Sequence, residues 1–208
     1  MAIEIQWYGR TCFRIRGREG IIVTDPCPPD SGYKLGKLSA NSVTISNRAL
    51  AGYSYAQGVA DEPKVFDAPG EYEVGGMLIE AVPMPGVDGA RNIGFIIEVE
   101  GIKVGHLGLP APTGFKPPEK FGEVDILLMP VGAGGSLAPA QAADIMTSMD
   151  PPVAIPMHYK TDQETLALEP LSAFLRESGA TVEAQPRFQS TKSGLPQELT
   201  VVVLEARG

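Results

Sequence analysis

Short apolar segments that alternate with polar residues dominate the first half of the chain. Ile3, Ile5 and Trp7 alternate with polar side chains, and this period of two predicts a half-buried β-strand. The same reasoning predicts further strands over residues 12–16, 20–24, 64–67, 71–74, 77–82, 92–99 and 102–107. The strands from 64 to 82 are expected to form one meander, and the proline-containing stretch 83–89 a loop.

The second half carries longer apolar segments and two stretches with helical spacing. Residues 125–130 and 153–156 are apolar throughout, which predicts buried strands. Apolar residues three and four apart predict one helix from Pro139 to about Asp150 and another over residues 165–178, where Gly179 ends it. Two short strands, over 181–183 and 199–204, are expected to close the chain.

The order of these elements predicts the fold class. Strands come first in two antiparallel blocks and helices come late, so a sheet-on-sheet core flanked by helices is expected. The predicted fold is α+β, a four-layer αββα sandwich. At 208 residues the chain is long enough for one sizeable core, and residues 1–208 are expected to form a single domain.

The net charge and the amino-terminal residues indicate which kinds of partner and which cellular compartment to expect. The net charge of −8 repels phosphate backbones, so nucleic acid is not expected as a partner unless the basic residues cluster. No apolar segment approaches the roughly 18 residues that a membrane span needs, and no membrane association is expected. The first residues lack the basic and apolar regions of a signal peptide, so a cytoplasmic location is predicted, with Cys12 and Cys27 reduced.

The stretch from residue 42 to residue 53 presents the main functional question. Val43 and Ile45 alternate with hydroxyl residues as a short strand would, and Ser46, Asn47 and Arg48 follow where a strand end opens into a loop. Such loops commonly hold the chemistry of α/β proteins. This loop has no His, Asp, Glu or Cys, and therefore offers no strong metal ligand and no evident acid, base or nucleophile.

Six sequence blocks, taken together, carry a family likeness. They are WYG followed by CF (7–9 and 12–13), TDP (24–26), DAPGEY (67–72), HLG (106–108), EVDIL (123–127) and IPMHYK (155–160). In this order they resemble the metallo-β-lactamase superfamily, and within it the small bacterial Zn-dependent hydrolases similar to L-ascorbate-6-phosphate lactonase. The resemblance covers residues 3 to about 160 and implies the αββα fold and a hydrolase ancestry.

In that family a His-x-His-x-Asp-His run at a strand end binds two zinc ions. The resemblance places this run on four positions that hold no competent zinc ligand: Asn47, Ala49, Leu50 or Ala51, and Gly52. Three further ligand positions fall on Arg10, on residues 84–86 and on Leu109, so only His158 keeps the family residue. The chain has two histidines, whereas a binuclear site needs about five to seven ligands, and no zinc cofactor is expected.

Several residues near the expected cleft have more than one interpretation. A mononuclear metal site from His106 or His158 with Asp25, Asp67 or Cys27 is an alternative. Without metal, Asp25 is expected to pair with Arg10 or Arg48. Arg10, Asn47 and Arg48 are the candidate binding residues for a small anionic ligand, although the arginines can equally serve internal charge compensation. His158 is either a remaining acid or base or a packed, hydrogen-bonded histidine.

The leading hypothesis is a metallo-β-lactamase-fold protein without metal ligands, non-catalytic, that acts through binding or assembly. Its partner would be a second copy of the chain, an active relative or a small anion. The alternative is an enzyme that hydrolyses a small phosphorylated or lactone substrate through unconventional residues. That alternative requires His158 and Asp25 to converge with Arg10 and Arg48 in one cleft.

Overall fold

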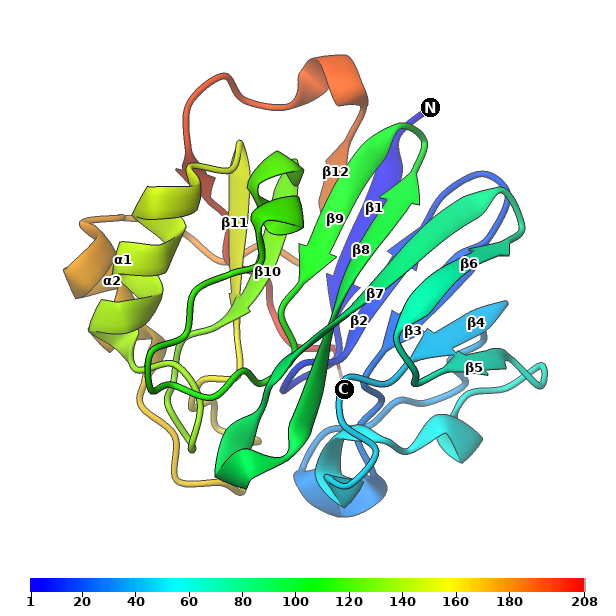
Figure 1. Ribbon diagram of the computed structural model, residues 1–208, viewed down its shortest axis with the longest axis horizontal. Helices are drawn as coiled ribbons and strands as arrows, with labels where there is room; N and C mark the ends of the chain where they lie inside the picture. Colours follow the sequence, from blue (N-terminus) through cyan, green and yellow to red (C-terminus); the bar gives the residue numbers. More distant parts are fainter. Residues whose placement is uncertain (208) are drawn as a thin grey trace.

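A computed structural model describes residues 1–207, and its architecture is two packed β-sheets with helices on one side (Figure 1). The first sheet has the strand order β12-β1-β2-β3-β4-β5. Its strands are β1 (Ile3–Trp7), β2 (Phe13–Arg16), β3 (Ile21–Thr24), β4 (Ser42–Thr44), β5 (Lys64–Phe66) and β12 (Phe188–Ser190). Gly208, the last residue of the expected domain, lies outside the described residues.

The second sheet has the order β13-β11-β10-β9-β8-β7-β6. Its strands are β6 (Gly70–Val74), β7 (Met77–Pro85), β8 (Arg91–Val99), β9 (Ile102–His106), β10 (Ile126–Pro130), β11 (Val153–Met157) and β13 (Thr200–Val201). Strands β6 to β9 pair antiparallel, whereas β9, β10, β11 and β13 run parallel. Parallel strands need crossover connections. The first α-helix lies in the connection from β10 to β11 and the second in that from β11 to β13, whereas residues 107–125, which join β9 to β10, contain a 3₁₀ helix and no α-helix.

The helices α1 (Pro139–Met149) and α2 (Leu171–Ser178) lie side by side next to β10 and β11 (Figure 1). Pro139 begins α1 and Gly179, with a left-handed φ of 68°, ends α2, both as expected. Short 3₁₀ helices form many of the remaining turns. They are η1 (Pro29–Ser31), η2 (Ala51–Tyr53), η3 (Ala56–Gly58), η4 (Val87–Gly89), η5 (Glu119–Glu123) and η6 (Lys192–Gly194).

The main core lies between the two sheets and under the helices. Alternate residues of β1 and β2, including Ile3, Ile5 and Phe13, are fully buried against the apolar face of the second sheet, where Phe95 and Ile97 are equally inaccessible. This alternation is the one the sequence predicts, since successive strand residues point to opposite faces. The expected mixed fold of two packed sheets is therefore confirmed.

Two predicted strand arrangements were wrong. The expected meander over 64–82 is divided between the sheets, because β5 pairs with β4 while β6 and β7 form a hairpin in the second sheet. The proline-containing stretch after residue 82 continues β7 to Pro85 instead of forming a loop. The prolines are tolerated there because β6 pairs only as far as Ala81, so their missing N–H groups are not needed by a neighbour.

The C-terminal third also differs from the prediction. The helix expected from residue 165 begins only at Leu171, because Pro170 is extended, with ψ 152°, and bridges to Lys160. No strand forms over 181–183, and β12 pairs with β1 instead. The last strand shortens to β13. Within the described range of the chain, no helix is both long and apolar enough to span a membrane.

The fully buried ring of Phe95 provides a test of the core. We expect Phe95→Ala to lower the free energy of unfolding by about 3–5 kcal/mol, since it removes a buried ring and leaves a cavity. The matched control is Leu78→Ala on the adjacent β7, whose side chain is 51% exposed, with an expected change within about 0.5 kcal/mol. Urea denaturation of both variants measures the difference, and equal losses would contradict this core assignment.

Candidate functional site

Four segments from distant parts of the chain meet beyond the ends of β1, β4, β9 and β11. The backbone N–H of His158 donates to the carbonyl of Arg10 at 3.0 Å, and that of Ile93 donates to Ser46 at 2.8 Å. These bonds connect the two sheets at the edge where the loop 46–53 leaves β4. The turn at Arg10, the loop after β4 and the segment at His158 therefore meet in one region.

A buried ion pair forms the centre of this region. The Arg10 side chain is 6% exposed and that of Glu164 is fully buried, with Arg10 Nη2 and Glu164 Oε1 3.2 Å apart. Arg10 Nε also donates to both carboxylate oxygens at 3.3 Å, and Nη1 donates to the carbonyl of Gly52 at 3.1 Å. Burial by itself lowers the pKa of Arg10, but the hydrogen bonds and charge of Glu164 raise it overall, so the guanidinium stays charged.

Gly52 leaves room for the Arg10 side chain. A Cβ at this position would lie 2.5 Å from Arg10 Nη1, so any other residue would force the guanidinium to shift. The guanidinium thus occupies the space where the resemblance places the last histidine of the zinc-binding run.

Tyr53 and His158 form the next layer of the site. Tyr53 Oη lies 2.8 Å from His158 Nε2, and the Arg10 guanidinium carbon sits 5.4 Å from the centre of the tyrosine ring. Burial, and then the charge of Arg10, lower the pKa of His158 to about 3. Burial is likewise the main cause that raises the pKa of Tyr53. At neutral pH both groups are uncharged, and His158 is a packed, hydrogen-bonded histidine.

An apolar cluster fills the space beside this layer. Tyr53, Val87 and Leu109 are each at most 8% exposed and pack together with Leu50. Leu109 stands where the resemblance places the aspartate that bridges two metals, and Leu50 falls within the zinc-binding run. This part of the region therefore has the composition of a small core.

Asp25 does not pair with either arginine, which corrects the expected pairing. Its Oδ1 accepts from the backbone N–H of Ser46 at 2.6 Å, and its Oδ2 lies 3.9 Å from His106 Nε2. His106 Nε2 also lies 2.9 Å from the carbonyl of Thr11. Burial raises the pKa of Asp25 and lowers that of His106, while each group partly offsets the shift of the other. Asp25 therefore fixes the start of the loop after β4.

Asn47 and Arg48 hold the loop and point to different environments. Asn47 is 5% exposed, and its Oδ1 accepts from the backbone N–H of Ala49 at 3.0 Å, which is a turn within the loop. The Arg48 side chain is 74% exposed and pairs with Asp67 at the surface. Both candidate arginines therefore have carboxylate partners, and their contacts match internal charge compensation. A role for them in holding a small anion remains a prediction.

The donors needed for a metal ion do not gather here. Among residues 1–207, no three His, Cys, Asp or Glu side chains form a group that could hold a metal. A mononuclear metal site at His106 and Asp25 would need a third donor. Beside His158 lie the phenol of Tyr53 and the guanidinium of Arg10. Neither of these is a good ligand for zinc.

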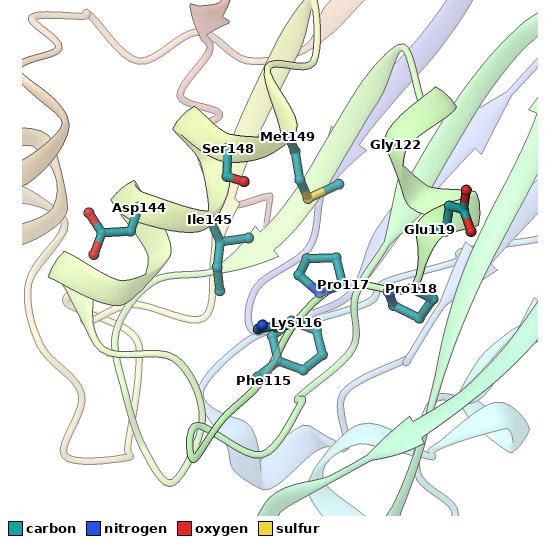
Figure 2. A pocket seen from close by; sticks show the side chains of 10 residues that line it. All are labelled: Phe115, Lys116, Pro117, Pro118, Glu119, Gly122, Asp144, Ile145, Ser148 and Met149. Atoms are coloured by element: carbon teal, nitrogen blue, oxygen red, sulfur yellow. The ribbon is translucent and has the colours of Figure 1, made fainter.

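Two surface pockets bear on the site. A cavity of about 510 Å³ opens directly over Arg10 and is lined by η2, Asp30 and Thr165. A second pocket of about 630 Å³ lies between η5 and α1 (Figure 2). In it Asp144 and Glu119 stand on opposite sides and point away from each other, with Ile145 and Met149 between them. No acid and base converge there, and the pocket over Arg10 is the one that belongs to the site.

Sequence reasoning missed Glu164 and Tyr53, the two main partners in this region. Glu164 directly precedes the stretch expected to be a helix, where a charged residue indicates a solvated surface. It lies 154 residues from Arg10 along the chain, and no local pattern links them. Tyr53 ends the loop after β4. Its hydrogen bond to His158 joins residues 105 positions apart, and no local pattern links them either.

Comparisons with known proteins extend over most of the chain. A family model described as a beta-lactamase superfamily domain matches residues 4–158. A Thermotoga maritima crystal structure, assigned to the Zn-dependent hydrolases of the metallo-β-lactamase superfamily, is 33% identical with a TM-score of 0.78, covering 99% of this chain and 100% of that one. A UPF0173 metal-dependent hydrolase of Thermococcus onnurineus is 33% identical, over 76% of this chain and 85% of the relative.

A UPF0173 protein of Pyrococcus furiosus is 28% identical, over 78% of this chain and 86% of the relative. The matches span both sheets and include every segment of the site up to His158. The narrower likeness to L-ascorbate-6-phosphate lactonase remains a prediction.

The Arg10–Glu164 pair generates the first prediction for this region. We expect Arg10→Met to lower the free energy of unfolding by about 3–5 kcal/mol, because it leaves the Glu164 carboxylate buried without a partner. Adding Glu164→Gln in the double variant should recover most of the loss. Arg48→Met, which breaks an exposed pair, is the control and should cost less than about 1 kcal/mol. Equal losses in the single and double variants would argue against a compensated buried pair.

The histidines provide a second prediction. Because the folded pKa of His158 is about 3 and the unfolded value is about 6.5, only the unfolded chain binds the extra proton between these values. The contribution of neutral His158 to the free energy of unfolding is therefore complete above about pH 6.5. It decreases as the pH falls toward 3, because protons then bind preferentially to the unfolded chain. We expect the imidazole proton NMR signal of His158, assigned with a His106→Gln variant, to stay constant between about pH 8 and 5. A titration with a midpoint near 6.5 would mean that the ring is solvated.

Proposed function

The chain belongs to the metallo-β-lactamase superfamily, and we propose that it is a member that works without bound metal and without hydrolase chemistry, through binding or assembly. The observation that carries the proposal is the buried Arg10–Glu164 pair at the place of the expected ligands. A guanidinium has only donor groups and no lone pair to offer a metal ion. It also engages both oxygens of the Glu164 carboxylate, which are then not free to bind a metal.

The residues present do not fit the metal centre that the family implies. His158 Nε2 is engaged by Tyr53, and its buried Nδ1, which has no hydrogen-bond partner among the described residues, is not part of a group of three metal ligands. The neighbouring positions are the apolar side chains of Leu50, Val87 and Leu109. Metal ligands in proteins are imidazoles, thiolates and carboxylates, and none of these apolar groups can replace them. The proposed mode of action therefore involves no step at a metal.

Relatives of this chain carry the name metal-dependent hydrolase, and that name describes those proteins. A hydrolase using unconventional residues would need His158 and Asp25 to act together with Arg10 and Arg48. Among residues 1–207, no hydrogen bond or ion pair joins Asp25 or Arg48 to His158. The depressed pKa of His158 also makes it a poor general base at neutral pH. These contacts favour the non-catalytic role.

The exposed side chains favour a role in ligand binding. They do not favour assembly with another protein through an apolar face. Over the described chain, the exposed large apolar side chains are Met1, Val65, Leu78 and Leu166. Three of them belong to separate segments, β5, β7 and the loop before α2, and four such side chains are few for a stable apolar interface. The open pocket over Arg10 is the binding surface that this proposal assigns to the cleft. The small anion predicted as the ligand of this cleft would have to share Arg10 with Glu164.

Metal content tests the proposal directly. We expect protein purified without chelator, from medium supplied with zinc and manganese, to contain far less than one metal ion per chain. Because a ligand that binds only the folded state raises the melting temperature, added zinc or EDTA should leave that temperature unchanged.

The Thermotoga maritima relative, purified in the same way, serves as the reference for metal retention. About two zinc or manganese ions per chain, removable together with a hydrolase activity, would overturn the proposal.

A further inference from the structure

Basic side chains gather on the outer face of the first sheet, away from the cleft. A surface pocket of about 420 Å³ is lined by five cationic side chains: Arg14, Arg16, Lys37, Arg187 and Arg207. Five of the chain's 17 basic residues thus share one pocket with Glu4, one of its 25 acidic residues. In a protein of net charge −8, this is a pronounced local reversal of charge.

The first sheet carries two of these cations, and the segments beside it carry the other three. Ile5 and Phe13 face the core, so Glu4, Arg14 and Arg16 project from the opposite face of β1 and β2, where Glu4 and Arg16 are directly paired in register. The backbone of Arg207 is held beside β1, because its N–H donates to the carbonyl of Trp7 at 2.8 Å. The ordered backbone limits the entropy that the pocket loses on binding.

Glu4 cannot neutralise the pocket. One of its oxygens lies 3.2 Å from Arg14 Nη1, and the other lies 3.4 Å from Arg187 Nη1 and accepts from Gln189 at 3.0 Å. Arg16, Lys37 and Arg207 have no carboxylate partner among residues 1–207, and all three are exposed. Arg10 and Arg48 in the cleft, by contrast, each have their own carboxylate. Three cations without a carboxylate partner among residues 1–207 therefore lie together in this pocket.

From this arrangement we infer a binding site for a compact polyanion, a chain of phosphate groups, in the outer-sheet pocket. Guanidinium groups donate paired N–H groups that match phosphate oxygens, and Gln6, Tyr8 and Ser39 add neutral donors to the lining. The unpaired cations repel one another in the empty pocket, and a polyanion relieves that repulsion. The cluster is small and the rest of the chain is acidic, so an extended nucleic acid fits less well than a compact ligand.

The test is a calorimetric titration of the full chain with inorganic tripolyphosphate at low ionic strength. We expect one molecule bound per chain, with weaker binding at 0.15 M salt because the charges are partly screened. Arg16→Gln and Arg207→Gln should each weaken binding about tenfold or more, since each removes a charged donor. Both positions are exposed, and circular dichroism checks that the variants are folded.

The matched control is Arg176→Gln on α2, which removes the same charge from a side chain that is 76% exposed and outside the pocket. It should leave the affinity within about twofold of the original, because distant exposed charges are screened. A nucleoside triphosphate forms a second arm. Affinity equal to that of tripolyphosphate supports recognition of the phosphate chain alone, and tighter binding supports an added contact of the base with Tyr8.

Three results would overturn the inference: no saturable binding of tripolyphosphate, equal weakening by Arg176→Gln, or tight binding of a single-stranded RNA oligonucleotide without binding of tripolyphosphate. The site is independent of the metal content of the cleft, because the outer-sheet pocket and the pocket over Arg10 share no lining residue. The metal analysis therefore tests the proposed function, and the titration tests the outer-sheet site independently of it.

Discussion

The buried ion pair between Arg10 and Glu164 is the interaction on which the organisation of this end of the molecule depends. A buried charge is tolerated only when a partner of opposite charge and enough hydrogen bonds surround it, and Arg10 obtains both from Glu164 and Gly52. The same residue offers its carbonyl to the backbone of His158 and to the indole of Trp7. One residue at the turn after β1 thus joins the loop after β4 to the segments that follow β11.

In the function proposed here, this arrangement takes the place of bound metal ions. Metal ions draw loops together through their carboxylate and imidazole ligands. In this chain the loops are joined by the Arg10 guanidinium, by the phenol of Tyr53 and by the packing of Val87 against Leu109. The charges of Arg10 and Glu164 balance each other within the chain, and apolar side chains fill the space beside them.

The arginines near the cleft and on the outer sheet form two groups that differ in whether a carboxylate neutralises them. Those near the cleft are each matched by a carboxylate, and they serve the fold. Those on the outer sheet exceed the carboxylate beside them, so their field extends into solvent. Net charge alone conceals this difference, since an acidic chain can still concentrate its cations where the sheet places alternate residues on one face.

The sequence by itself determined the strands with clear alternation, the mixed two-sheet fold and the scarcity of histidine, because these depend on local periodicity and on composition. It also located the loop after β4 and the turn at Arg10. It could not divide the strands over 64–82 between two sheets, since strand pairing is a non-local choice. Nor could it identify Glu164 as the partner of Arg10 or gather Arg16, Lys37 and Arg207 into one pocket. Those contacts join residues far apart in the chain, and only the tertiary structure decides which distant side chains share a buried space or a face.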